Sequence, residues 1–148
     1  MTLRVYLDTN IFIEAFEQTG ITHEIAEAVF GQVERGVFFA VISELCVAEL
    51  LVKPLRENEQ DLIEAYSTLM LLPDAFSVCP INRDTLVEAA RQRAINPGTK
   101  LPDAIHIATA RLHECKVFLT TETRLHMPRD LIRLNLDNST ITELQALA

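Results

Sequence analysis

The chain has 148 residues, of which 49% are hydrophobic, so it can bury a substantial core and is expected to form a single domain over residues 1–148. A formal net charge of −8 argues against a passive nucleic-acid coat, which needs a broad basic surface. No apolar run reaches the roughly 20 residues of a membrane span, the N-terminus lacks the pattern of a signal peptide, and the three cysteines show no disulfide or zinc spacing, so we expect a cytoplasmic protein.

Short apolar strands alternate with amphipathic helices along the chain. In chain order, we predict a strand at 3–7, a helix at 11–17, a helix at 22–35, a strand at 37–42, a helix at 43–52, a helix at 57–72, a strand at 76–80, a helix at 84–94, a helix at 103–114, strands at 116–119 and 131–134, and a helix at 140–147. This alternation predicts an α/β fold, a three-layer α/β/α sandwich around a mostly parallel central sheet.

Helical spacing also predicts which side chains face the core and where the helices end. Phe16 in the helix at 11–17 and Ala28 in the helix at 22–35 are among the residues expected to face inward. Lys53-Pro54 should end the helix that begins at Ser43, and Pro73-Asp74 should end the next one.

Four acidic residues stand where a parallel sheet would present the carboxyl ends of its strands, the edge at which such sheets bind ligands. Asp8 follows the first strand, and Glu49 lies in the helix after the second. Asp103 opens the helix that leads to the fourth strand, and Glu122 lies just beyond that strand. Two carboxylates about 4 Å apart repel by roughly 4 kcal/mol at an effective dielectric near 20. A hard cation between them offsets that cost, so convergence of these acids would indicate a divalent-metal site.

Asp8 and Glu49 also have ordinary structural explanations. Asp8, Thr9 and Asn10 are all helix-capping residue types, with Thr9 or Asn10 as the expected cap. A hydroxyl and an amide beside a carboxylate equally suit the surroundings of a metal ligand. Glu49 has apolar neighbours in its helix and therefore needs a partner, and an ion pair with Lys53 at i,i+4 spacing is the alternative to a metal.

Asp103 and Glu122 can likewise be explained as acids at helix starts. The alanine-rich run after Asp103 would let its helix pack closely on the sheet and hold the carboxylate at the sheet edge. His106, one turn further on, could hydrogen-bond Asp103, but a lone histidine is more often structural, so it is not among the predicted site residues. Thr120 could orient a carboxylate or a water, and Glu122 could reach a metal directly or through water.

The acidic segments together resemble the PIN-domain family of metal-dependent ribonucleases, in particular the toxin component of VapBC toxin–antitoxin pairs. Residues 7–10, 43–51, 101–110 and 118–122 are similar to the four motifs of that family, in order and at sensible spacing. The fourth motif of the family usually reads Thr-Asn-Asp, so this chain departs from it at Thr121 and at Glu122.

The resemblance implies that Asp8, Glu49, Asp103 and Glu122 form the catalytic and metal-binding set, with Mg²⁺ or Mn²⁺ as the cofactor and single-stranded or loop RNA as the substrate. It also implies a homodimer that a small antitoxin silences through a basic tail. RNA affinity would come from local basic groups near the acids, which we expect to be Lys53, Arg56, Arg91, Arg93, Lys100 and Arg124.

Two alternatives remain open. The departure at Glu122 suits a PIN-like scaffold that has lost catalysis and binds RNA or protein. A different acid-cluster enzyme, such as a phosphatase of another α/β fold, would be favoured by an Asp-x-Asp motif, but Asp8-Thr9-Asn10 lacks the second aspartate.

Overall fold

The computed structural model describes residues 1–71 and 76–148, and in these residues five strands form one sheet in the order β3-β2-β1-β4-β5. The strands are β1 (Arg4–Leu7), β2 (Phe39–Ser43), β3 (Phe76–Cys79), β4 (Val117–Leu119) and β5 (Ile132–Leu134). The helices are α1 (Thr9–Glu17), α2 (Ile21–Glu34), α3 (Leu45–Glu57), α4 (Gln60–Met70), α5 (Arg83–Ile95), α6 (Leu101–Leu112) and α7 (Thr140–Leu147). Every strand pairing is parallel, so the predicted α/β fold is confirmed.

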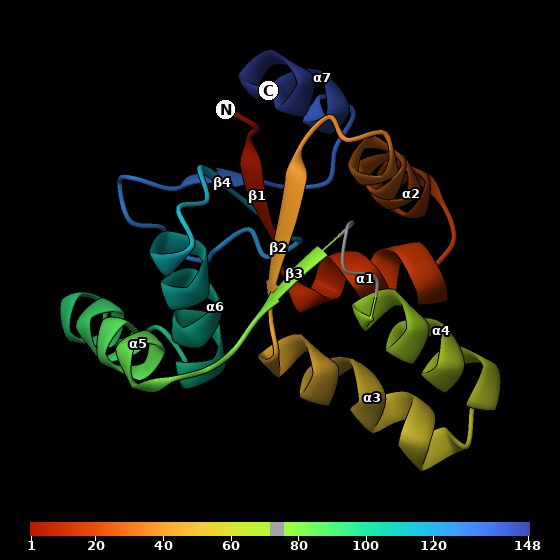
Figure 1. Cartoon of the computed structure of the whole chain (residues 1–148), viewed down its shortest axis with the longest axis horizontal. Helices are drawn as coiled ribbons and strands as arrows, with labels where there is room; N and C mark the ends of the chain where they lie inside the picture. Colours follow the sequence, from red (N-terminus) through yellow and green to blue (C-terminus); the bar gives the residue numbers. More distant parts are fainter. Residues whose placement is uncertain (72–75) are drawn as a thin grey trace.

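Helices cover both faces of the sheet, with α5 and α6 on one side and α1, α2 and α4 on the other (Figure 1). Successive side chains of β1 point to opposite layers. Val5 and Leu7 belong to the core that α1, α2 and α7 complete, whereas Tyr6 packs with Phe118 of β4 and Ile107 of α6. Burial on both faces explains why the strands read as continuous apolar runs.

Helix α6 is enclosed more completely than an ordinary surface helix, because it lies between the sheet and α5. Every residue from Ala104 to Ala110 is buried. Outside this run, Glu88 of α5 accepts a hydrogen bond from Arg111 of α6 at 2.6 Å, which ties the two helices together. Gln92, on the same helix as Glu88, also donates to it at 3.1 Å. Helix α6 is therefore fixed against the sheet and α5 from Ala104 onward, directly after Asp103.

The prediction that Lys53-Pro54 ends a helix is wrong, because α3 continues through Pro54 to Glu57. A proline inside a helix costs about 3 kcal/mol through a lost hydrogen bond and a ring clash. Here Pro54 is buried, and Asn58 closes the helix in the left-handed conformation with φ 56°. The predicted break at Pro73-Asp74 lies outside the described residues.

Two predicted inward positions are also wrong. Phe16 is 40% exposed while Phe12 is fully buried, and Ala28 is exposed while Ala26 is buried. Helical spacing identifies an apolar stripe, but the neighbouring elements decide which edge of that stripe they cover. None of the described helices is long and apolar enough to cross a membrane.

Candidate active site

The carboxyl ends of β1, β2 and β4 meet at one edge of the sheet, because these strands are parallel neighbours. Asp8 directly follows β1, and Glu122 lies three residues beyond the end of β4. Helix α3 leaves the end of β2 and carries Glu49, and α6 carries Asp103 in its first turn. The structure therefore brings all four predicted acids to the same edge.

Asp8 is buried, and its carboxylate accepts hydrogen bonds from three groups. Its Oδ1 accepts from the Thr9 backbone N–H at 2.8 Å, so Asp8 itself caps α1, in place of the predicted Thr9 or Asn10. Its Oδ2 accepts from the Thr120 hydroxyl at 2.7 Å and from the Asn10 side-chain amide at 3.2 Å. Asn10 also accepts from the Thr121 N–H at 3.0 Å, so these bonds join the ends of β1 and β4.

Glu49 is held by side chains from two other elements. Its Oε1 accepts from the Thr9 hydroxyl at 2.7 Å and lies 2.6 Å from His106 Nε2. The alternative partner, Lys53, instead pairs with Glu17 at 3.1 Å. Burial raises the pKa of Glu49, but the hydrogen bonds from His106 and Thr9 outweigh burial and lower that pKa below its ordinary value.

His106 lies beneath the acids with 2% of its surface exposed, and its neighbours fix its tautomer. The Glu49 carboxylate can only accept, which leaves Nδ1 of His106 as the acceptor for the Tyr6 hydroxyl, and that hydroxyl itself accepts from the Ser43 N–H at 3.2 Å. Burial raises the pKa of Tyr6 well above its ordinary value, which keeps the proton on the oxygen. His106 Nε2 then carries the hydrogen that is donated to Glu49, an assignment that follows from the hydrogen-bond network.

Asp103 differs from Asp8 and Glu49 because no hydrogen bond or ion pair to its carboxylate is present within residues 1–71 and 76–148. It is half-buried, and burial is the first cause that raises its pKa. Asp8, Glu122 and Glu49 raise the pKa further, against the opposing effect of His106. A half-buried carboxylate beside three others and without a donor is an arrangement that a bound cation would stabilise.

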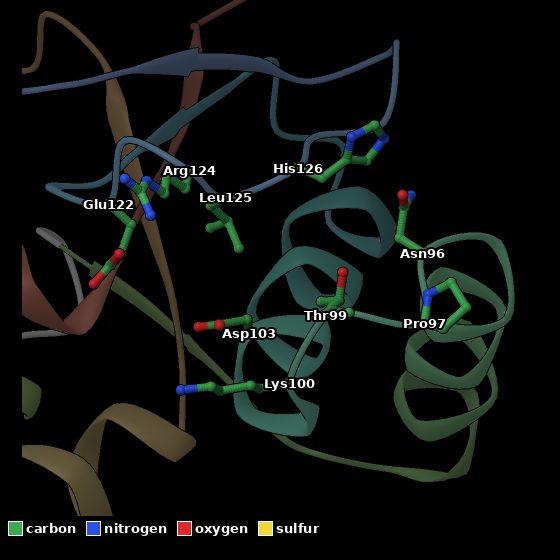
Figure 2. Close-up of a pocket in the computed structure, with 10 residues that line it drawn as sticks. Asn96, Pro97, Thr99, Lys100, Asp103, Glu122, Arg124, Leu125 and His126 are labelled. Atoms are coloured by element: carbon green, nitrogen blue, oxygen red, sulfur yellow. The ribbon is translucent and has the colours of Figure 1, made fainter.

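Glu122 and Asp103 line a cleft of about 440 Å³ between the α5–α6 turn and the segment that follows β4. Figure 2 shows Asp103 and Lys100 extending in the same direction, with Glu122 opposite them. Glu122 is exposed, whereas its backbone N–H donates to the Thr120 hydroxyl at 3.0 Å. The Glu122 side chain therefore faces solvent, although its main chain is tied to the same network.

The four carboxylates offer only oxygen donors, which suit hard ions such as Mg²⁺ and Mn²⁺ better than soft ones. Across the part of the chain that the structure describes, no three His, Cys, Asp or Glu side chains are grouped closely enough to hold an ion together. The donor chemistry thus fits a divalent ion. The four side chains lie along the same edge of the sheet but do not form a closed cluster of ligands.

Sequence reasoning missed the contribution of His106 and Tyr6. The sequence allows a hydrogen bond between His106 and Asp103, one turn apart, but in the structure His106 bonds Glu49. The available signal was a polar side chain in a helical run that is otherwise small and apolar, because a buried polar group needs a partner. The expectation that Thr120 orients a carboxylate agrees with its 2.7 Å bond to Asp8.

The fold is an all-parallel α/β sandwich that presents four acidic side chains at the carboxyl edge of its sheet. The sequence model of the PIN domain matches residues 5–129, and the chain belongs to the PIN domain family. Comparison with curated proteins gives no match.

Several solved structures share the fold. A toxin–antitoxin complex from Klebsiella pneumoniae has a TM-score of 0.65 at 24% identity and covers 86% of this chain and 95% of that one. VapBC2 from Rickettsia felis, bound to a DNA fragment from its promoter, has a TM-score of 0.68 at 14% identity, and the match covers 91% of this chain and 100% of that one. VapC20 of Mycobacterium tuberculosis, described as a sarcin–ricin loop cleaving toxin, has a TM-score of 0.64 at 14% identity, and the match covers 77% of this chain and 86% of that one. At these identities the likeness concerns the fold.

Proposed function

We propose that the protein is a metal-dependent endoribonuclease that hydrolyses RNA phosphodiester bonds and serves as the toxin of a type II toxin–antitoxin pair. The observation that carries the proposal is Asp103, which is half-buried without a hydrogen-bond donor among the described residues. Its pKa is raised by burial and by Asp8, Glu122 and Glu49. Such a group of charges is unfavourable without a cation and useful with one.

In this proposal Asp8, Glu49 and Asp103 hold Mg²⁺ or Mn²⁺, and Glu122 holds it directly or through water. When bound, the ion lowers the pKa of a coordinated water and offsets the charge that develops on the phosphate. The chain's own contribution is to keep the carboxylates in place, Asp8 through Thr120 and Glu49 through His106. Ligands that are fixed by surrounding hydrogen bonds lose less freedom on binding.

The toxin role and its partner are supported by fold likeness to one structure described as a toxin–antitoxin complex and another described as a cleaving toxin. The net charge of −8 suits a basic antitoxin segment. We also propose a homodimer in the cytoplasm, where three buried free thiols would stay reduced.

Cleavage of a structured-RNA pool in Mg²⁺ and in Mn²⁺ tests the proposal directly. The wild type should cut, and Asp103→Asn should not. Asp84→Asn is the matched control, because Asp84 also lies in the first turn of a helix but away from the acids. Equal cutting by wild type and Asp103→Asn would refute the role of the acids. Expression in bacteria should arrest growth for the wild type and the control only.

The alternative function is a catalytically inactive PIN-like module that binds RNA or protein. It is favoured by Glu122, which is one carbon longer than the aspartate usual at this position of the family and is exposed. No cutting by the folded wild type would support this alternative, and recovery of cutting in Glu122→Asp would then locate the defect.

A further inference from the structure

The cleft that contains Asp103 and Glu122 extends well beyond the acids. Its far end is formed by Asn96 and His126, and Leu125 lies between the two ends (Figure 2). Its volume of about 440 Å³ falls in the range of sites that hold small ligands. The acids therefore stand at one end of a larger polar cleft.

Two of the six basic residues expected near the acids line this cleft, namely Lys100 and Arg124. The other candidates are committed elsewhere or lie outside it. Lys53 pairs with Glu17 at 3.1 Å, and Arg91 pairs with Glu88 at 3.3 Å. Arg93 donates to the Thr99 carbonyl at 3.1 Å, and Arg56 lines no part of the cleft.

Neither Lys100 nor Arg124 makes an ion pair or a side-chain hydrogen bond within residues 1–71 and 76–148. Lys100 also occupies the N-cap of α6 without making a cap hydrogen bond. A cation is unfavourable there, because the N-terminus of a helix carries partial positive charge. Helix stability therefore does not explain Lys100, whereas a bound anion would.

Because the chain carries a net charge of −8, an RNA strand approaching the acids would be repelled unless local cations received its phosphates. Lys100 and Arg124 are placed on opposite walls beside the acids, one in the α5–α6 turn and one after β4. The imidazole of His126 offers an aromatic face of the kind on which unpaired bases stack, and Leu125 adds an apolar contact nearer the acids.

We infer that this cleft is a nucleotide subsite for single-stranded RNA, in which Lys100 and Arg124 bind the phosphates that flank the scissile one and an unpaired base lies against Leu125 and His126. The inference rests on the proposed function, because it assigns to RNA a cleft that begins at the candidate catalytic acids.

Binding of a fluorescent single-stranded RNA in EDTA tests this inference, with every variant made in an Asp103→Asn background so that the RNA stays intact. Each phosphate contact contributes about −0.7 to the slope of log K against log salt for single strands. Lys100→Gln with Arg124→Gln should make the slope shallower by about 1.4 and weaken binding about 25-fold at 0.1 M salt. The matched control is Lys116→Gln with Arg129→Gln, which removes the same charges outside the cleft and should leave the slope unchanged.

The inference is overturned if the cleft variant keeps the salt slope of the Asp103→Asn parent, or if the control variant loses as much affinity as the cleft variant. It is also overturned if the parent binds no RNA. A blunt RNA duplex, which presents no unpaired base, should bind more weakly and be less affected by the cleft substitutions. Cleavage separates this inference from the proposed function. For cleavage, Lys100→Gln with Arg124→Gln is made in the protein that keeps Asp103. RNA cutting by this variant with an unchanged KM refutes the subsite alone, whereas binding with the predicted slopes but no cutting by the wild type refutes the nuclease alone.

Discussion

Replacing Asp103 by asparagine should stabilise the metal-free protein, although it should abolish catalysis. The substitution keeps the shape of the side chain and removes the carboxylate whose pKa is raised by burial and by Asp8, Glu122 and Glu49. Partly exposed charge pairs are each worth about 0.2–1 kcal/mol, so relief of three repulsions stabilises by about 1.5 kcal/mol. The charge also favours the first turn of α6 by about 0.5 kcal/mol, which the substitution loses.

The net gain of about 1 kcal/mol should raise the melting temperature by about 3 °C in EDTA for a chain of this size. Asp84→Asn isolates the helix-dipole contribution, because Asp84 is an exposed first-turn acid of α5, and it should lower the melting temperature slightly. If Asp103→Asn lowers the melting temperature as much as Asp84→Asn does, the repulsion deduced for this edge is wrong.

The pH dependence of this gain has a defined sign. The ordinary pKa of an aspartate, 3.8, applies to Asp103 in the unfolded chain, and the pKa is higher in the folded protein. Between these two pKa values the folded state therefore binds more protons than the unfolded state. Wild-type stability due to this carboxyl is therefore full below pH 3.8 and is lost as the pH rises through the folded pKa. The advantage of Asp103→Asn should thus be present at pH 7 and vanish below pH 3.8, as thermal melts across this range would measure.

Saturating Mn²⁺ should reverse the order of stabilities. An ion that binds only the folded state stabilises it by about 2.7 kcal/mol at a concentration 100 times its Kd. The wild type should gain this amount, and Asp103→Asn should gain much less because a ligand is missing. Equal Mn²⁺ stabilisation of both proteins would place the ion away from Asp103.

Two further substitutions, Tyr6→Phe and Glu88→Gln, test a contact beneath the site and the contact between α5 and α6. Tyr6→Phe removes the donor to His106 and the acceptor of a buried N–H, so it should destabilise by about 1–2 kcal/mol in urea and weaken Mn²⁺ binding measured by calorimetry. Tyr66→Phe also loses a hydrogen bond, but to a residue outside the site, so a loss of Mn²⁺ affinity in both variants would contradict the positioning role. Glu88→Gln should cost about 2 kcal/mol in urea unfolding, less than a fully buried pair, because Arg111 is one-third exposed and keeps Asp130 at 3.0 Å.

The sheet and the edge that gathers the acids could be predicted from local patterns. Continuous apolar runs indicate strands buried on both faces, and parallel strands must present their carboxyl ends together. Asp8 follows β1 directly and Glu122 lies three residues beyond β4, so the pairing of these two strands brings both acids to the same edge. The same logic could not predict distances between side chains, which depend on how each helix is set against the sheet.

The missed features depend on residues that are remote in sequence. His106 contacts Glu49 across 57 positions and Tyr6 across 100, so no local pattern reveals that its two ring nitrogens are both committed. Pro54 shows the opposite failure, because a reliable local rule for ending helices was outweighed by burial and by the cap at Asn58. In both cases the packing decided an outcome that spacing and propensity left undetermined.

The enclosure of α6 also bears on how this protein can evolve. Asp103 and His106 stand on one helix whose residues 104–110 are all buried, so a larger side chain at any alanine of this run would displace both residues together. A change in what the edge beside Asp103 binds is therefore difficult to reach through substitutions in α6. The exposed segments at 96–100 and 122–126 surround the same cleft and tolerate change more easily. Divergence among related chains should accordingly concentrate in these two segments and spare the helix that carries Asp103 and His106.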